Sequence, residues 1–106
     1  MNMGKILKQA QKMQGNLVAA QEEFGKKEFE TSVGGGMVKI VMFGDQRLKS
    51  IKISPDVAGD VEMLEDMIVT AVNKLQEDIK KIMSDEMNKI TGGLNIPGLF
   101  WLVDGR

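Results

Sequence analysis

The stretch from Phe29 to Ile53 most constrains what this chain can fold into, because it has the pattern of three short strands joined by two tight turns. The first turn follows Val33 and contains Gly34-Gly35-Gly36, and the second contains Gly44 and Asp45. Runs rich in β-branched and aromatic residues, separated by glycine and aspartate, are typical of β-hairpins. Consecutive hairpins predict an antiparallel sheet with the strands in the order one-two-three.

Alternation of apolar and polar residues predicts which side chains face inward, since neighbouring residues of a strand point to opposite faces. The middle strand also has Val41 and Phe43 on its other face, so we expect it to be the central one. Lys52 is expected to point outward from the third strand. The inner face is predicted to consist of Phe29, Thr31, Val33, Val38, Ile40, Met42, Ile51 and Ile53.

Residues 2–24 have the pattern of a long amphipathic helix. Its apolar residues are spaced alternately by three and four, which indicates the narrow seam of a coiled-coil-like contact. Gly25 follows, and we expect it to end the helix in the left-handed conformation. The seam consists of Met3, Ile6, Ala10, Met13, Leu17, Ala20 and Phe24.

A second stripe on this helix is basic and contains Lys5, Lys8 and Lys12. At about 100° per residue, these lysines lie roughly 130° around the helix from the apolar seam and face water. No acidic residue precedes Glu22, so the segment carries local positive charge. Two interpretations remain open, a solvated lysine face and an edge that contacts phosphate.

A second long helix is predicted after Ser54-Pro55-Asp56, with Asp60 as its N-cap. We expect Ser84-Asp85 to interrupt it and Gly92-Gly93 to end it. Its first half is acidic, whereas Lys80, Lys81 and Lys89 restore positive charge near its end. Its apolar side is broader than that of the first helix and includes Leu64, Ile68, Ala71, Leu75, Ile79, Ile82 and Ile90.

Helix length predicts that this chain is a homodimer. A helix from Val61 to Ile90 is about 45 Å long, whereas a seven-residue strand spans about 23 Å. The α+β fold should therefore have two layers, with a helix–sheet–helix order and apolar surface that extends beyond the sheet. A second copy in a two-fold dimer is the simplest cover for this surface. We expect the core and the dimer interface to use Ile6, Met13, Leu17, Phe24, Ile40, Leu75, Ile79 and Ile82.

Composition excludes several kinds of site. The chain has 106 residues, the size of one domain, and it contains no cysteine and no histidine. Disulfides, zinc–thiolate sites and imidazole catalysis are therefore excluded. We expect no metal site, no cofactor and no small-molecule substrate. No apolar run is long enough to cross a membrane, so we expect a cytoplasmic protein without membrane contact.

Two other patterns do not support catalysis or nucleotide binding. The three glycines at 34–36 precede a predicted strand, whereas a phosphate-binding loop precedes a helix. The acidic pairs Glu22-Glu23 and Glu65-Asp66 consist of adjacent helical residues. Adjacent residues diverge by about 100° on a helix, so neither pair converges on one substrate atom. We expect no catalytic residues.

Five segments together resemble the YbaB/EbfC family of bacterial nucleoid-associated proteins. They occur in the family's order and cover residues 3–100, so we expect one domain over residues 1–100. Residues 101–106 lie beyond the usual family ending and form a C-terminal extension of unknown role. The similar segments are Met3–Gln14, Gly34–Ile40 followed by Gly44, Ile51–Pro55, Glu62–Asp66 followed by Ala71–Asn73, and Gly92–Leu99.

The resemblance implies a homodimer whose helices project from a joined β core like tweezers, and DNA binding that is sequence-tolerant or weakly selective. We expect the DNA to be a duplex, because most aromatic residues fit core or tail patterns and offer no stacking platform for single strands. It implies a role in nucleoid organisation and gene regulation. The net charge of −1 does not by itself indicate DNA binding, so a local basic surface must supply the phosphate contacts. The candidates for that surface are Lys5, Lys8, Lys12, Lys80, Lys81 and Lys89.

An alternative is a protein-interaction or scaffold dimer with no direct role on nucleic acid. Two long helices with apolar overhang and an acidic middle fit this function too. Salt separates the two, because phosphate-driven binding weakens steeply as salt rises, whereas apolar docking does not.

Overall fold

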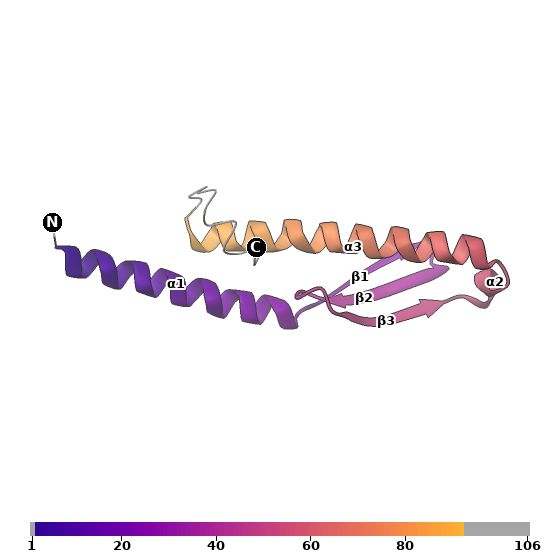
Figure 1. The fold of residues 1–106 in the computed structure, drawn as a ribbon, viewed down its shortest axis with the longest axis horizontal. Helices are drawn as coiled ribbons and strands as arrows, with labels where there is room; N and C mark the ends of the chain where they lie inside the picture. Colours follow the sequence, from indigo (N-terminus) through magenta and orange to yellow (C-terminus); the bar gives the residue numbers. More distant parts are fainter. Residues whose placement is uncertain (1, 93–106) are drawn as a thin grey trace.

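Two long helices and a three-stranded sheet make up residues 2–92, the part of the chain that the computed structural model describes (Figure 1). The molecule is elongated, with extents of 69 × 22 × 20 Å. The predicted α+β order of helix, sheet and long helix is confirmed. The elements are α1 (Met3–Lys26), β1 (Glu28–Val33), β2 (Val38–Phe43), β3 (Leu48–Ile53), α2 (Pro55–Ala58) and α3 (Val61–Ile90).

The sheet is antiparallel with the order β1-β2-β3, as predicted, and β2 is its central strand. Val38, Ile40 and Met42 of β2 are all buried. α3 packs on this inner face and contacts both β1 and β2. The structure therefore has two layers, the sheet and α3, and the other face of the sheet is turned away from α3.

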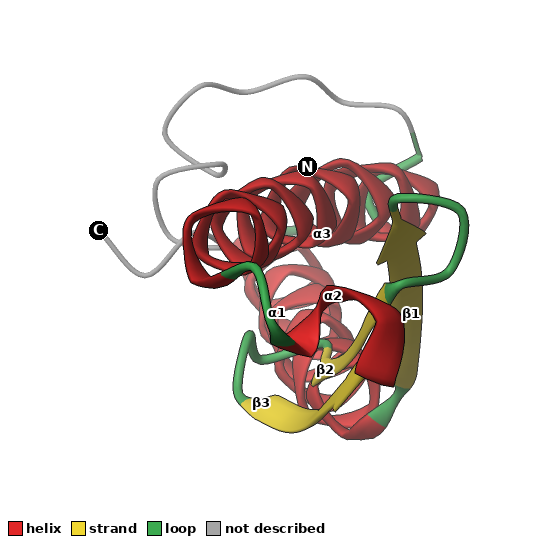
Figure 2. Cartoon of the chain, turned by 90° about the vertical axis from the view of Figure 1, so that its right-hand side faces the viewer, coloured by secondary structure: helices red, strands yellow, loops and turns green. Residues whose placement is uncertain are grey.

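The inner face of β3 is the part of the sheet that α3 does not cover. Ile53 lies opposite Val38 and Ile51 opposite Ile40, so both share the inner face. Their exposed fractions are nonetheless 41% and 38%, and that of Leu48 is 47%. Figure 2 shows α3 above β1 and β2, with β3 curled away from it. The prediction that Ile51 and Ile53 point inward was right about the face and wrong about burial in a single chain.

The core contains most of the predicted residues. Phe24, Ile40, Leu75 and Ile79 are at most 2% exposed, and Leu17 is 8% exposed. The ring centroids of Phe24 and Phe29 lie 5.2 Å apart, which connects the end of α1 to the sheet. The core thus forms where α1 ends, where the inner faces of β1 and β2 meet, and along the middle of α3.

Three predicted core or interface residues are exposed in the single chain. Ile6 is 40% exposed, Met13 is 37% exposed and Ile82 is 38% exposed. Ile6 and Met13 lie in the N-terminal half of α1, which projects beyond the sheet and beyond the end of α3 (Figure 1). Ile82 lies in the last third of α3, which extends past the sheet. These residues are not in the core of one chain, and their place in a dimer interface stays a prediction.

The predicted N-cap of α3 is confirmed, but two predicted interruptions are wrong. Asp60 Oδ1 accepts a hydrogen bond from the Met63 N–H at 3.1 Å. Gly25 does not end α1, which continues to Lys26. A Cβ added at Gly25 would lie 3.4 Å from the Cβ of Asp45 in the turn between β2 and β3. Ser84-Asp85 does not break α3, which is continuous to Ile90. Met87, in this last part of α3, is buried.

Glycines with positive φ occupy the turn between β1 and β2 and the position after α3. Gly34, Gly35 and Gly36 have φ values of 63°, 65° and 91°, so the turn between β1 and β2 needs residues that tolerate positive φ. Gly92, with φ of 68°, follows the last turn of α3, as predicted.

The one-turn helix α2 was not predicted. Ser54 Oγ accepts a hydrogen bond from the Asp56 N–H at 3.2 Å, and Pro55 occupies the first turn. Serine as N-cap followed by proline is a known helix-start signal. The signal is present in the sequence, where the same residues also mark the end of a strand.

Some predictions lie outside the described residues. These are the role of Gly93, the apolar tail from Leu94 to Phe100 and the extension from Trp101 to Arg106. Within residues 2–92, no helix is both long enough and apolar enough to span a membrane.

Candidate nucleic-acid interface

The first half of α1 carries a basic face. Lys5, Lys8 and Lys12 are all exposed, and their spacing of three and four places them on one side of the helix. None of the ion pairs found within residues 2–92 includes them. We call residues 3–14 of α1 the basic arm. Its positive charge is not offset by any acidic residue before Glu22.

The other predicted lysines lie near the end of α3. Lys80, Lys81 and Lys89 are exposed, and Lys89 in the last turn interacts favourably with the helix dipole. Asp85 lies four residues from both Lys81 and Lys89, so it reduces the local charge there. The basic arm is therefore the less compensated of the two groups.

The six lysines do not form one patch in a single chain. They lie on two helices that extend towards the same end of the molecule, away from the sheet (Figure 1). α1 and α3 contact each other, and the buried residues of α1, Leu17 and Phe24, are in its second half. The role of these six lysines in DNA binding stays a prediction.

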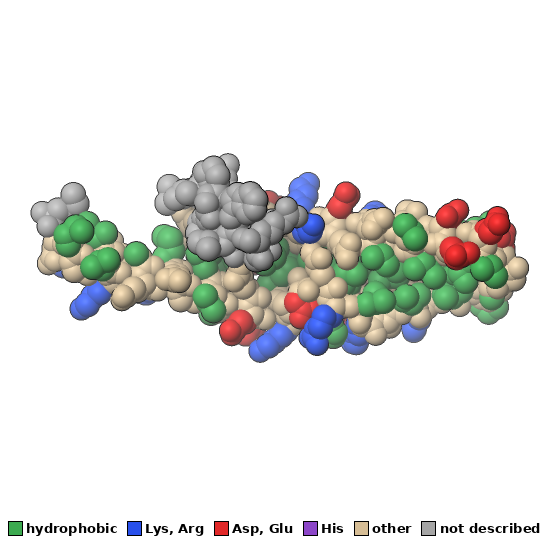
Figure 3. Space-filling view, in the orientation of Figure 1, with side chains coloured by type: hydrophobic (Ala, Val, Ile, Leu, Met, Phe, Trp, Pro, Cys, Tyr) green, Lys and Arg blue, Asp and Glu red, His purple; other side chains and the backbone are tan. Residues whose placement is uncertain are grey.

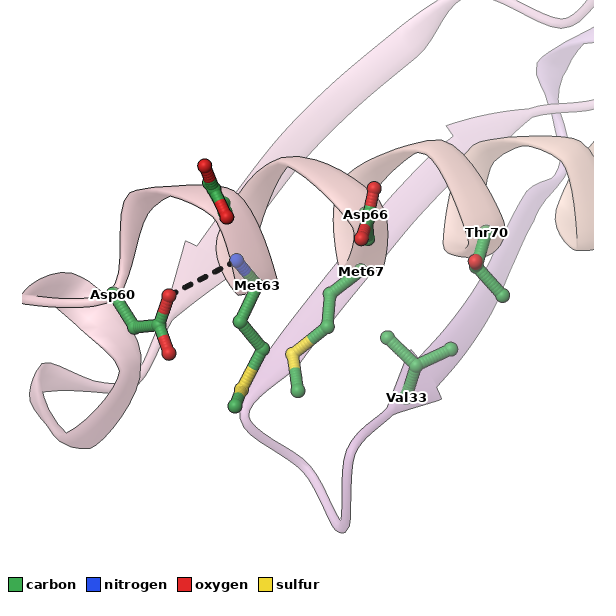
Figure 4. Close-up of a pocket in the computed structure, with 7 residues that line it drawn as sticks. Val33, Asp60, Met63, Asp66, Met67 and Thr70 are labelled. Atoms are coloured by element: carbon green, nitrogen blue, oxygen red, sulfur yellow. Dashed lines mark hydrogen bonds between the residues drawn. The ribbon is translucent and has the colours of Figure 1, made fainter.

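The opposite end of the molecule is acidic. Figure 3 shows acidic side chains gathered over the start of α3, far from the basic arm. A shallow groove there is lined by three carboxylates, two methionines, Val33 and Thr70 (Figure 4). Such a surface repels phosphate. The molecule therefore has a basic end and an acidic end along its long axis. The charged and thioether residues of this groove are Asp60, Glu62, Asp66, Met63 and Met67.

The acidic groove is not a metal site. Asp60 already accepts a hydrogen bond from the backbone of α3 as its N-cap. Across residues 2–92, no three acidic side chains converge in a way that could hold a metal ion.

The outer face of the sheet carries basic residues that the sequence reasoning did not propose as a site. Lys39 and Lys52 project from neighbouring positions of β2 and β3. Lys49 Nζ lies 2.8 Å from Glu28 Oε1, and Lys39 Nζ lies 3.7 Å from Glu30 Oε1. The alternation that placed Lys52 outward was the signal that could have revealed this row.

The turn between β2 and β3 holds a local ion pair. Arg47 Nε donates to Asp45 Oδ2 at 2.8 Å, and its guanidinium lies 5.1 Å from the centroid of the Phe43 ring. The backbone N–H of Arg47 and then its guanidinium lower the pKa of Asp45 below its usual value. Arg47 is therefore engaged within the turn and is a weaker phosphate candidate than Lys39 or Lys52.

Comparison with known proteins identifies relatives over nearly the whole chain. The model of the YbaB/EbfC DNA-binding family matches residues 1–94. A nucleoid-associated protein of Desulforamulus reducens is 50% identical over 93% of this chain and 96% of its own length. A nucleoid-associated protein of Thermoanaerobacter pseudethanolicus is also 50% identical, over 93% of this chain and 91% of its own.

One solved structure shows the same fold. The crystal structure of an uncharacterized protein from Helicobacter pylori matches with a TM-score of 0.75 at 16% sequence identity. The match covers 86% of this chain and 98% of that one. At this identity, the likeness concerns the arrangement of the helices and the sheet alone.

Proposed function

The chain belongs to the YbaB/EbfC DNA-binding family, and from this premise we propose that it binds duplex DNA as a homodimer through the phosphate backbone. Its relatives named nucleoid-associated proteins support a place in the bacterial nucleoid, within the cytoplasm. Binding of this kind changes the conformation of DNA and so contributes to nucleoid organisation and gene regulation. The activity is binding, and no catalytic step is assigned to any residue.

The observation that carries this proposal is the charge polarity of the long axis. The basic arm presents Lys5, Lys8 and Lys12 without internal partners, whereas Asp60, with two further carboxylates, makes the other end acidic. Non-specific DNA affinity comes mainly from phosphate contacts with lysine and arginine. A duplex would therefore contact the basic arm and avoid the start of α3, even though the net charge of the chain is −1.

Uncovered apolar surface supports the homodimer. The arm exposes Ile6 and Met13, and the inner face of β3 exposes Ile51 and Ile53. Isolated exposed apolar residues are ordinary, but contiguous apolar surface on an elongated chain marks an interaction site. A two-fold arrangement would cover both regions with the same residues of a second copy. It would also present two basic arms to one duplex.

Photocrosslinking tests where the duplex lies. A photoreactive residue at Gln9, which is exposed on the basic arm, should crosslink to a random-sequence duplex at low salt. The same residue at Thr70, which is exposed beside the acidic groove, should give little crosslinking. Equal crosslinking from both positions would contradict the proposed polarity.

A charge placed in the arm seam should weaken the dimer and spare the fold. The double change Ile6→Glu and Met13→Glu should lower the mass measured by light scattering towards that of one 11.7 kDa chain. Helical circular dichroism should persist, because neither residue is in the single-chain core. Val18→Glu is the matched control, since Val18 is 48% exposed on the same helix but off the seam. An unchanged mass for the double variant would remove the arm from the interface.

A further inference from the structure

The outer face of the sheet has a row of three side chains that runs across all three strands. Ser32 of β1 lies opposite Lys39 of β2, and Lys39 lies opposite Lys52 of β3. Residues opposite each other in a sheet share a face, and this face is opposite the buried Val38 and Ile40. Ser32, Lys39 and Lys52 are all exposed.

Two lysines directly opposite each other are unfavourable for the sheet, because like charges on paired positions repel. Lys39 is only loosely paired, with Glu30 at 3.7 Å, and its side chain is 51% exposed. Lys52 takes part in none of the ion pairs found within residues 2–92. The neighbouring Lys49, by contrast, is paired with Glu28 at 2.8 Å. The row therefore has positive charge that ion pairs within the described residues do not neutralise.

We propose that Lys39, Lys52 and the Ser32 hydroxyl form a phosphate site that contacts the DNA backbone separately from the basic arm. Neighbouring strands are about 4.8 Å apart, so the two flexible ammonium groups can approach one phosphate together. A serine hydroxyl beside them can donate a third hydrogen bond. The inference rests on the proposed duplex binding and adds a contact surface to it.

The row lies at the end of the sheet near the acidic groove, which Val33 next to Ser32 lines, but it is on the opposite face of the sheet from that groove. α3 covers only the inner face of the sheet, and the exposed row faces the other way. The uncovered apolar residues of β3, Ile51 and Ile53, also lie on the inner face. A second copy that covers those residues therefore leaves the outer row open to a phosphate. The positive charge of the row complements the negative phosphates of a duplex backbone, which is the ligand that we propose for it.

Substitution of Lys52 tests the site, because it should weaken DNA binding without lowering thermal stability. In Lys52→Glu, a carboxylate faces Lys39, so the thermal midpoint should be unchanged or higher. Affinity for a random-sequence duplex in low salt should fall about 10-fold, and the slope of log affinity against log salt should decrease by about one for each phosphate that is no longer neutralised. Lys52→Gln should also lower the affinity for the duplex, but by less, about 3-fold.

The matched control removes another outer-face lysine without changing the net charge. The double variant Glu28→Gln with Lys49→Gln eliminates the 2.8 Å ion pair and should bind DNA as the wild type does. If the wild type binds and Lys52→Glu has the same affinity and salt slope, the phosphate site is overturned while duplex binding stands. If Lys52→Glu and Lys52→Gln both lower the thermal midpoint, their weaker binding reports damage to the fold and the site is overturned. If the wild type itself does not bind, the proposed function fails first.

Discussion

Charge reversal of the whole basic arm, Lys5→Glu with Lys8→Glu and Lys12→Glu, is expected to abolish detectable duplex binding at moderate salt. In a dimer these changes remove two sets of three candidate phosphate-binding lysines. Phosphate contacts supply essentially all of non-specific affinity, and a protein with about six of them already loses roughly 1,000-fold in affinity between about 50 and 200 mM salt. Without these contacts, no binding should be detectable at moderate salt. Fluorescence anisotropy with a labelled random duplex measures this directly.

The fold should survive this change. All three lysines are exposed and take part in no ion pair found in residues 2–92. The control is the triple change of the same lysines to arginine, which keeps the charge and should keep the affinity within a few-fold. Wild-type affinity in the glutamate variant would remove the arm from the DNA interface.

Gly44→Ala is expected to produce the largest loss of stability among the single changes considered. Gly44 lies where the end of α1 packs against the turn between β2 and β3, and its N–H donates to the Lys27 carbonyl oxygen at 2.9 Å. An added Cβ would overlap the carbonyl oxygen of Phe24 and lie 2.8 Å from its carbonyl carbon. Backbone must move to relieve that overlap, so we expect a cost of about 3 kcal/mol.

Thermal denaturation at fixed protein concentration measures this effect. For a chain of this size, about 3 kcal/mol lowers the midpoint by roughly 12 °C or more. Gly59→Ala is the matched control, because Gly59 has φ of −83° and nothing lies within 4 Å of an added Cβ. It should change the free energy of unfolding by less than about 0.5 kcal/mol. Equal midpoints for the two variants would mean that α1 does not pack closely against this turn.

Local patterns in the sequence were sufficient to predict the strands and one helix cap. Alternation identified Val38 and Ile40 as inward-facing residues of β2, because period-two burial is a property of one strand. Asp60 was identified as an N-cap because its chemistry acts within three residues. Features that depend on one helix or strand, and on the spacing of apolar residues within it, were therefore predictable.

Features that depend on how elements pack were not predictable from those patterns. Ile51 is exposed because α3 lies over β1 and β2, a placement that no strand pattern determines. Gly25 is helical and lies beside Asp45, which is twenty positions away in the sequence. The exposed seam residues Ile6 and Met13 have a helical period that fits a core and an interface equally well. We propose that a second copy of the chain covers them, and a single chain does not contain that copy.

The basic surface was predicted only in part for the same reason. The arm lysines are close in sequence, so helical spacing alone placed them on one face. Lys39 and Lys52 are thirteen residues apart and become neighbours only through the register of β2 and β3. The sequence indicated that Lys52 points outward, but pairing it with Lys39 required the observed register.

The most direct test of the account is a titration of a random-sequence duplex at about 50 and 200 mM salt, with mass measured by light scattering on the same sample. We expect a dimer, twice the 11.7 kDa mass of one chain, whose affinity falls steeply as salt rises, because phosphate contacts release counterions. A dimer that never binds the duplex, even at the lower salt, would contradict the account. It would favour a protein partner for the same fold.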